Sequence, residues 1–128
     1  MPFHLSLLPS TFAICLLDAD ASVPDWAQHS SADFFSLTRT ADELSIVCRD
    51  DAVPNSVQSD RDWRCLKVAG PLDLAATGIL SSLTRGLPEA EIPVFGISTF
   101  ATDYLLVKSQ HLDLATAALR LNGHTIVN

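Results

Sequence analysis

The segment 91–107 reads EIPVFGISTFATDYLLV and indicates the fold more clearly than any other part of the chain. Its two apolar runs, 92–97 and 104–107, are rich in the β-branched and aromatic residues that are typical of strands. The residues between them, 98–103, carry hydroxyl groups and one carboxylate, which favour a turn because their oxygens can bond to nearby backbone groups. The segment therefore predicts two strands joined by a polar turn. The hydroxyl groups of this turn either serve only its own backbone or also bind a ligand.

Apolar residues at helical spacing lie on both sides of this strand pair. Before it, Leu74 to Leu87 predicts a helix with Leu80, Leu83 and Leu87 on one face. After it, residues 111–121 repeat the pattern and predict a second helix. The segment is therefore a pair of neighbouring strands between two helices.

Two further strands complete the second half of the chain. Residues 64–68 are strand-like and are ended by Gly70-Pro71, and residues 125–127 follow Gly123, where a left-handed helix end favours glycine. The resulting order is strand, helix, strand, strand, helix, strand. This order is that of the split βαβ, ferredoxin-like arrangement.

The first half of the chain predicts short strands, one weak helix and a polar connection. Residues 19–32 predict a short helix that begins near Pro24, and residues 50–62 predict the connection to the second half. We place the domain boundary near Asp60, which gives domains at 1–60 and 61–128. The β-prone segments are residues 5–8, 11–17, 34–38 and 44–48, with hairpin loops at Pro9-Ser10 and Ala41-Asp42-Glu43.

The composition excludes several classes of partner. The 128 residues are 48% hydrophobic, which is enough for a core in a chain of this length. The formal net charge of -7 comes without a basic patch, so we expect no nucleic-acid partner. No apolar run approaches the roughly 18 residues that cross a bilayer, so we expect no membrane partner and a cytoplasmic protein.

Neither a metal site nor catalytic machinery is indicated. Three cysteines without a CxxC pair predict buried, reduced thiols, and the four histidines lack the spacing that places two imidazoles on one helix face. Gly96-Ile97-Ser98 resembles the start of a nucleophile elbow, but Phe100 replaces the glycine that the sharp turn needs. We therefore expect no metal, no cofactor and no enzyme activity, although a catalytic site could be built on almost any fold.

One pair of segments suits a small zwitterion. The loop and predicted helix start at Thr77-Gly78-Ile79 would expose amide groups that suit a carboxylate. Asp103, in the polar turn, could face an ammonium group through a charge-assisted hydrogen bond. Together these segments favour a free amino acid as the ligand.

Four segments in order resemble the ACT-domain family, in particular the tandem-ACT amino-acid sensors of the CASTOR type and their small bacterial relatives. They cover nearly the whole chain. They are FFSLTRT at 34–40, ELSIVC at 43–48, GPLDL with GIL within 70–80, and ISTFATDY with LV within 97–107.

The resemblance implies an α+β fold of two tandem ferredoxin-like (βαββαβ) ACT modules, the N-terminal one abbreviated. It also implies regulation by ligand binding rather than catalysis, and a homodimer in which the amino acid lies between ACT modules of the two subunits. Pro93 and Val94 would come from the other subunit. The implied ligand-binding residues of the first subunit are Asp73, Ala76, Gly78, Ile79, Leu80, Thr99, Phe100 and Asp103.

The chain departs from the arginine sensors at one position. Ala76 and Thr77 stand where those sensors carry an acidic residue just before the helix glycine, so a guanidinium would lack a bidentate partner there. Asp73 or Asp103 could substitute. A second hypothesis is a ligand-independent dimeric module that presents a surface to a partner enzyme or regulator, since obligate interfaces are rich in apolar area.

Overall fold

The fold consists of two compact units. The structure is a computed structural model that describes residues 2–28, 34–73 and 75–128. One unit, here the C-terminal unit, comprises Met1–Leu8 and Arg64–Asn128, and the other, the N-terminal unit, is Pro9–Trp63. Residues 2–8, which the predicted boundary assigned to the N-terminal domain, are thus grouped with the C-terminal unit. The long strands β1 (His4–Leu17) and β4 (Gln58–Val68) each contribute residues to both units.

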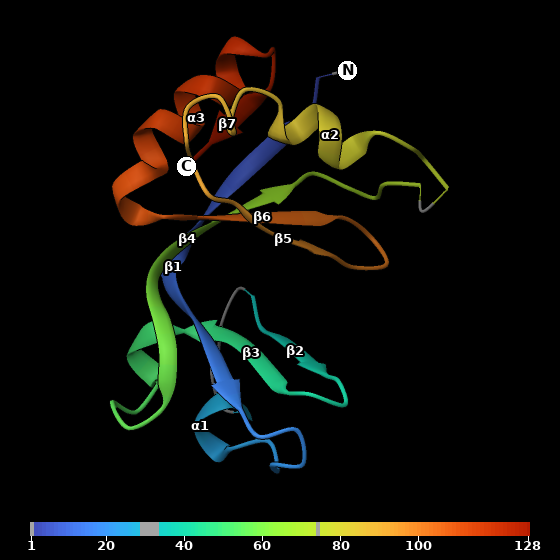
Figure 1. Cartoon of the computed structure of the whole chain (residues 1–128). Coiled ribbons are helices and arrows are strands. Elements are labelled where there is room, and N and C mark those ends of the chain that lie inside the picture. The colour runs from blue at the N-terminus through green and yellow to red at the C-terminus, as the bar shows by residue number, and fades with distance from the viewer. Residues whose placement is uncertain (1, 29–33, 74) are drawn as a thin grey trace. The chain divides into compact units, whose positions relative to one another are not determined.

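The C-terminal unit has the predicted order of elements. In its part of the sheet the strand order is β7-β1-β4-β6-β5, so the first residues of β1 lie between β7 and β4 (Figure 1). Without β1 this is the strand order of a ferredoxin-like fold. After β4 the elements are α2 (Ile79–Thr84), β5 (Phe95–Ser98), β6 (Asp103–Lys108), the short 3-10 helix η2 (Ser109–His111), α3 (Leu112–Leu121) and β7 (Thr125–Val127).

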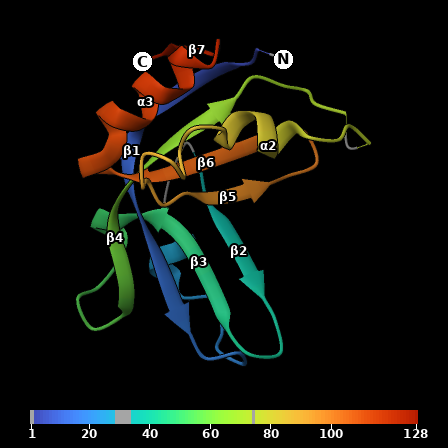
Figure 2. The same cartoon turned by 45° about the horizontal axis from the view of Figure 1, so that its top comes forward.

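The core of this unit lies between its sheet and its two helices. Figure 2 shows α2 and α3 over the same face of the strands. Leu83 of α2 and Leu119 of α3 are fully buried against strand residues, so burial of apolar surface holds both helices in place. The central cluster consists of Phe3, Leu5, Leu66, Val68, Leu83, Leu105, Leu119 and Ile126.

The first helix of this unit is shorter than the sequence predicts. The prediction ran from Leu74 to Leu87, but α2 begins only after Gly78, whose φ of 76° is left-handed and suits glycine. Leu74 lies outside the described residues. Leu83 and Leu87 are buried as expected, whereas Leu80 is 41% exposed. The prediction that these three leucines share one helix face was wrong for Leu87, because α2 ends at Thr84.

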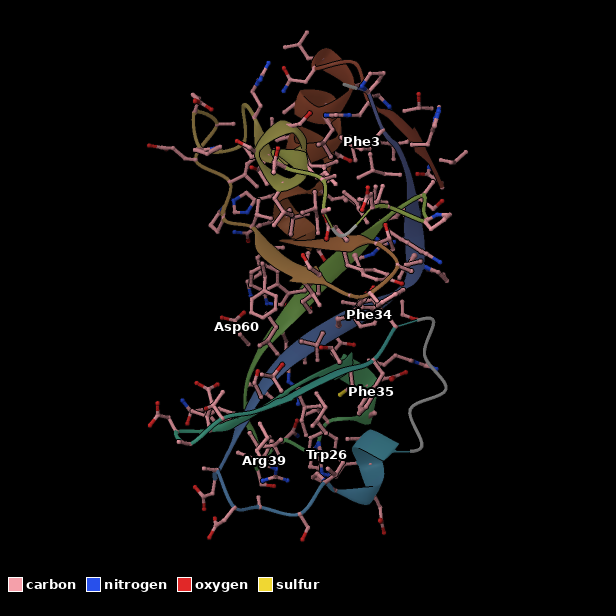
Figure 3. The ribbon with its side chains drawn as sticks, turned by 90° about the vertical axis from the view of Figure 1, so that its right-hand side faces the viewer. Phe3, Trp26, Phe34, Phe35, Arg39 and Asp60 are labelled. Atoms are coloured by element: carbon pink, nitrogen blue, oxygen red, sulfur yellow. The ribbon has the colours of Figure 1, made fainter. Side chains whose placement is uncertain are left out.

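The N-terminal unit is an abbreviated version of the same arrangement. Its strand order is β2-β3-β1-β4, with α1 covering one face and Trp26 packed against the core (Figure 3). A 3-10 helix, η1, stands where a second helix would complete the unit, which confirms the predicted abbreviation. Besides β1 and β4, its elements are α1 (Asp25–Gln28), β2 (Ser36–Arg39), β3 (Leu44–Arg49) and η1 (Asp50–Ala52).

Two predictions in this half were wrong in their boundaries. Pro9-Ser10 is not a hairpin loop, because β1 continues through it. The register of β1 with β7 ends at Ser6 and that with β3 begins at Phe12, so proline falls between the two ladders, where its missing amide costs no bond on that side. The connection at 50–62 is also shorter than predicted, since β4 already begins at Gln58.

The three cysteines are free and buried, which confirms the prediction of reduced thiols. Cys15 and Cys48 belong to the paired strands β1 and β3. A hydrogen bond between the two thiols raises the pKa of Cys48 above its ordinary value and lowers that of Cys15.

Candidate functional site

A four-residue hairpin loop between β5 and β6 forms one wall of the site. The strands are antiparallel, with Ser98 opposite Asp103. The amide of Thr99 donates to the carbonyl of Thr102 at 2.8 Å, and the hydroxyl of Thr99 donates to the same oxygen at 3.0 Å. The hydroxyl of Thr102 donates to the carbonyl of Val68 at 2.6 Å. The two threonines therefore serve the backbone, which fixes the loop and leaves other side chains for a ligand.

The loop that follows β4 forms the opposite wall. Gly70 approaches the hairpin closely, since a Cβ there would lie 3.0 Å from the carbonyl oxygen of Ala101. The amide of Leu72 donates to that same oxygen at 2.7 Å. Further along, Asp73 accepts a hydrogen bond from the amide of Ala75 at 2.9 Å. The loop is thus tied to the hairpin before it opens toward α2.

A pocket of about 360 Å³ lies between these walls. Its size falls in the range of roughly 300–1,000 Å³ that is typical of small-molecule sites. All of its lining belongs to the C-terminal unit. The lining residues are Leu72, Asp73, Ala76, Gly78, Ile79, Leu80, Ser81, Ser98, Thr99, Phe100, Ala101, Thr102 and Asp103.

The structure brings together most of the residues that the sequence singled out. Pro93 and Val94 lie outside the lining. Pro93 is exposed, whereas Val94 packs against the core of its own unit. The residues that do line the pocket are Asp73, Ala76, Gly78, Ile79, Leu80, Thr99, Phe100 and Asp103.

Other lining residues were not singled out as ligand-binding residues. Ser98 and Thr102 belong to the polar turn, which was recognised, but a hairpin does not reveal which side chains share one face until its register is known. Ser81 lies in the first turn of α2, and its place depends on the start of that helix at Gly78. The spacing of apolar residues did not reveal that the helix begins only after Gly78.

Asp103 is the most distinctive group of the pocket. The residue is only 8% exposed, although it lines the cavity. Its carboxylate has no hydrogen bond or ion pair with any part of the chain that the structure describes. Its oxygens are not among the fully buried polar atoms that lack a partner in the described residues, so they are accessible from the pocket. It is therefore a group that a cationic ligand would satisfy.

Several apolar side chains complete the lining. Phe100, at the tip of the hairpin, is 83% exposed, and Leu80 on α2 is 41% exposed. Leu72 and Ile79 lie deeper and pack against the core of the unit. Gly78 has open space where a Cβ would be, which keeps the backbone at the start of α2 accessible. The pocket thus combines one buried charge with an apolar rim.

Metal binding has no support in the geometry of the described residues. Among them, no three or more His, Cys, Asp or Glu side chains are gathered so as to hold a metal ion. Within the same residues, no helix has the length and apolar character needed to cross a membrane.

The family follows from a comparison with models of known domains. The model of the ACT domain matches residues 58–120, which contain every residue of the pocket. The chain thus contains an ACT domain. A further family model, of an N-terminal domain, matches residues 10–56. ACT domains are typically amino-acid-binding regulatory modules, which supports a regulatory role.

Known structures share the fold of this ACT-domain protein over nearly its whole length. Protein Atu0741 of Agobacterium tumefaciens is 38% identical, with a TM-score of 0.92 over 99% of this chain and 93% of that one. A Vibrio cholerae protein, VC0802, is 16% identical, with a TM-score of 0.75 over 94% and 89%. The regulatory subunit of aspartate kinase from Thermus thermophilus is 11% identical, with a TM-score of 0.61 over 93% and 97%.

A human relative extends the similarity to sequence. CASTOR3P is 29% identical over 99 residues, which cover 67% of this chain. The ACT-domain chain described here spans 61% of the length of that relative.

Proposed function

We propose that this protein is a regulator that binds a free amino acid in the pocket between the β5–β6 hairpin and α2. The observation that carries the proposal is the Asp103 carboxylate, which is 8% exposed and lines the pocket without a partner among the described residues. An α-ammonium group would form a charge-assisted hydrogen bond with it.

The α-carboxylate of the ligand would lie at the start of α2. The first amides of a helix have no partner within the helix, and the residues from Gly78 to Ser81 line the pocket. No side chain caps this helix end. The hydroxyl of Ser81 offers a further donor. The two charged ends of one amino acid would then be met by different walls of the pocket.

A second copy of the chain would close the pocket in this proposal. Pro93, just before the edge strand β5, is exposed and lies outside its own subunit's pocket. Proline has no amide to donate to a ladder, so it suits an edge position, where its ring would contact another chain without backbone pairing. Because Val94 packs inward, Pro93 is the better candidate of the two for contact with the neighbour's pocket.

The shared site can be tested by mixing two variants. Asp103→Ala removes the ammonium partner, and Pro93→Arg places a bulky cation at the closing edge. Each variant alone should lose the rise in melting temperature that amino acids cause. A mixed dimer has one doubly damaged site and one intact site, so the mixture should regain part of the response. A mixture that stays unresponsive, or a wild-type chain that light scattering finds monomeric, would contradict a shared site.

Binding itself is tested by a melting-temperature screen of the proteinogenic amino acids at millimolar concentration. A ligand that binds only the folded state stabilises it in proportion to the logarithm of its concentration over its dissociation constant. Asp113→Ala is the matched control for Asp103→Ala, because Asp113 is an exposed carboxylate on α3 of the same unit. The control should keep the full response. A screen in which no amino acid changes the melting temperature would exclude the proposed function.

A second candidate, the ligand-independent interaction module, is favoured by the outer face of α3. Leu114 is 59% exposed and Leu121 is 89% exposed, and the exposed Ala117 lies between them at helical spacing. Such an apolar stripe suits a protein partner. Under this hypothesis Leu121→Ser would abolish capture of a specific partner, while amino acids would leave the melting temperature unchanged.

A further inference from the structure

We propose that the pocket selects a neutral amino acid with an apolar side chain and excludes both acidic and basic amino acids. This inference rests on the proposed function, because it concerns the side chain of the same ligand. It is argued from the charges that line the pocket and from the exposure of its apolar rim.

Acidic side chains are excluded by the charges of the lining. Asp73 and Asp103 are its charged residues, and the described lining contains no lysine, arginine or histidine. A second carboxylate on the ligand would therefore meet two like charges and no cation. Since like charges repel and a desolvated charge needs a partner, aspartate and glutamate bind poorly in such a site.

Basic side chains are excluded by the way the two carboxylates are placed. Asp103, the buried one, pairs with the α-ammonium that every amino acid carries. Asp73 is exposed, and one of its oxygens already accepts the amide of Ala75 at 2.9 Å. A side-chain cation could reach only this solvated group, where water and salt screen the attraction. The side-chain cation would gain little binding energy from Asp73 and would lose hydration against the apolar rim.

Apolar side chains fit because they cover surface that is otherwise exposed to water. Phe100 is 83% exposed and Leu80 is 41% exposed, and both line the same pocket. Covering a large apolar side chain with a ligand removes apolar surface from water, which stabilises the complex. The exposure of Phe100 also means that the fold does not depend on it. Its place at the mouth of the pocket therefore points to contact with a ligand.

The test compares two amino acids that differ only at the end of the side chain. Norleucine and lysine have the same carbon chain, which ends in a methyl group in one and continues to an ammonium group in the other. Isothermal titration should give a dissociation constant for norleucine at least about tenfold lower than that for lysine, because the lysine ammonium has no buried partner. Glutamate should bind more weakly than methionine, which has a similar length.

The possible outcomes separate this inference from the proposed function. If lysine, arginine or glutamate binds as tightly as norleucine or more tightly, the apolar selectivity is wrong while amino-acid binding stands. If no amino acid binds, both are wrong.

Phe100→Ser tests the rim directly. The substitution should lower the affinity for norleucine several-fold and leave the weak binding of lysine unchanged. It should also preserve the melting temperature of the ligand-free protein. Leu121→Ser is the matched control, because Leu121 is 89% exposed on α3 and lies outside the pocket. The control should leave both affinities unchanged. If Phe100→Ser leaves the affinity for norleucine intact, the rim does not select the ligand.

Discussion

The β2–β3 hairpin of the N-terminal unit and the β5–β6 hairpin of the C-terminal unit have loops of the same length and the same construction. The loop residues are 40–43 in the first and 99–102 in the second. In each, the amide of the first threonine donates to the carbonyl of the last loop residue, at 2.9 Å from Thr40 and 2.8 Å from Thr99. Each threonine hydroxyl also accepts a backbone amide of its own loop. The backbones of the two hairpins are thus near repeats.

The side chains beside these loops differ in two positions. Arg39, just before the first loop, donates to the carbonyls of Ala19 and Ala21, so its guanidinium ties the hairpin to the loop after β1. Its counterpart in the second hairpin is Ser98, which lines the pocket. Just after the loops, fully buried Leu44 corresponds to Asp103.

The comparison shows that two hairpins with the same backbone differ in their surroundings: one loop is held by a side chain of the protein, and the other borders a pocket. In the N-terminal unit a long side chain of the protein itself fills the contact between hairpin and neighbouring loop. In the C-terminal unit the corresponding side chain, Ser98, is short and lines a pocket. There the Leu72 amide, rather than a side chain, joins the neighbouring loop to the hairpin. The fold accounts for the hairpins, and the side chains account for the binding site.

The largest expected effect comes from exchanging the residues after the loops. Leu44→Asp places an unpaired carboxylate in the core of the N-terminal unit and should lower the free energy of unfolding by about 3–5 kcal/mol. Asp103→Leu should leave stability unchanged or raise it, while removing the response to amino acids. Urea unfolding, with and without ligand, measures both. Equal loss of stability in the two variants would contradict the claim that Leu44 serves the core and Asp103 serves a ligand.

Thr102→Val tests the link between the second hairpin and β4. The Thr102 hydroxyl donates to the carbonyl of Val68 at 2.6 Å and is buried, so its removal leaves that carbonyl without this donor. The free energy of unfolding should fall by about 1–3 kcal/mol. Thr40→Val removes a threonine of the exposed loop in the N-terminal unit, the counterpart of Thr99, and should cost less. A larger loss from Thr40→Val would show that the buried bond contributes little.

Arg39→Ser should open the contact that this side chain fills. It removes hydrogen bonds to Ala19 and Ala21 and should lower the free energy of unfolding by about 1 kcal/mol. Arg39→Lys, which keeps the charge but lacks the forked donors, should recover only part of the loss. Full recovery by lysine would indicate that charge, rather than bond geometry, holds the loop.

Ser98→Arg should have the smallest effect on stability and a clear effect on binding. The position is exposed, so the fold should tolerate the change within about 0.5 kcal/mol. The guanidinium would compete with the ligand for Asp103, and the amino-acid response should fall. Ser98→Thr is the matched control that keeps a hydroxyl. An unchanged response in Ser98→Arg would place the ligand away from this wall.

Much of the second half of the fold could be predicted from the sequence. The strand pair around 98–103 and the helix from 111 to 121 follow from local patterns of apolar residues, which agree with the tertiary contacts that these segments make. The late start of α2 could not be predicted from the spacing of apolar residues, because it depends on the left-handed backbone of Gly78. The continuous strand through Pro9 also escaped prediction. Pro9 lies where the partner of β1 on one side changes from β7 to β3, and this change depends on the tertiary structure.

The candidate site was predicted as a set of segments, but its chemistry depends on the tertiary structure. The family resemblance identified Asp103 and the residues around Gly78, and the structure places them around one pocket. The sequence could not show that Asp103 is buried without a partner, or that Phe100 is left exposed at the rim. These properties arise from contacts between residues that are distant in the chain.

The most direct test of the central claim is the melting temperature of the wild-type protein and of Asp103→Asn with a saturating neutral amino acid such as norleucine. At 100 times its dissociation constant, the ligand should stabilise the wild type by about 2.7 kcal/mol, which raises the melting temperature by roughly 10 °C. Asp103→Asn, which keeps the shape but removes the charge, should show little or no rise. An equal rise in both proteins would contradict the claim that the buried Asp103 carboxylate binds the ligand's ammonium group.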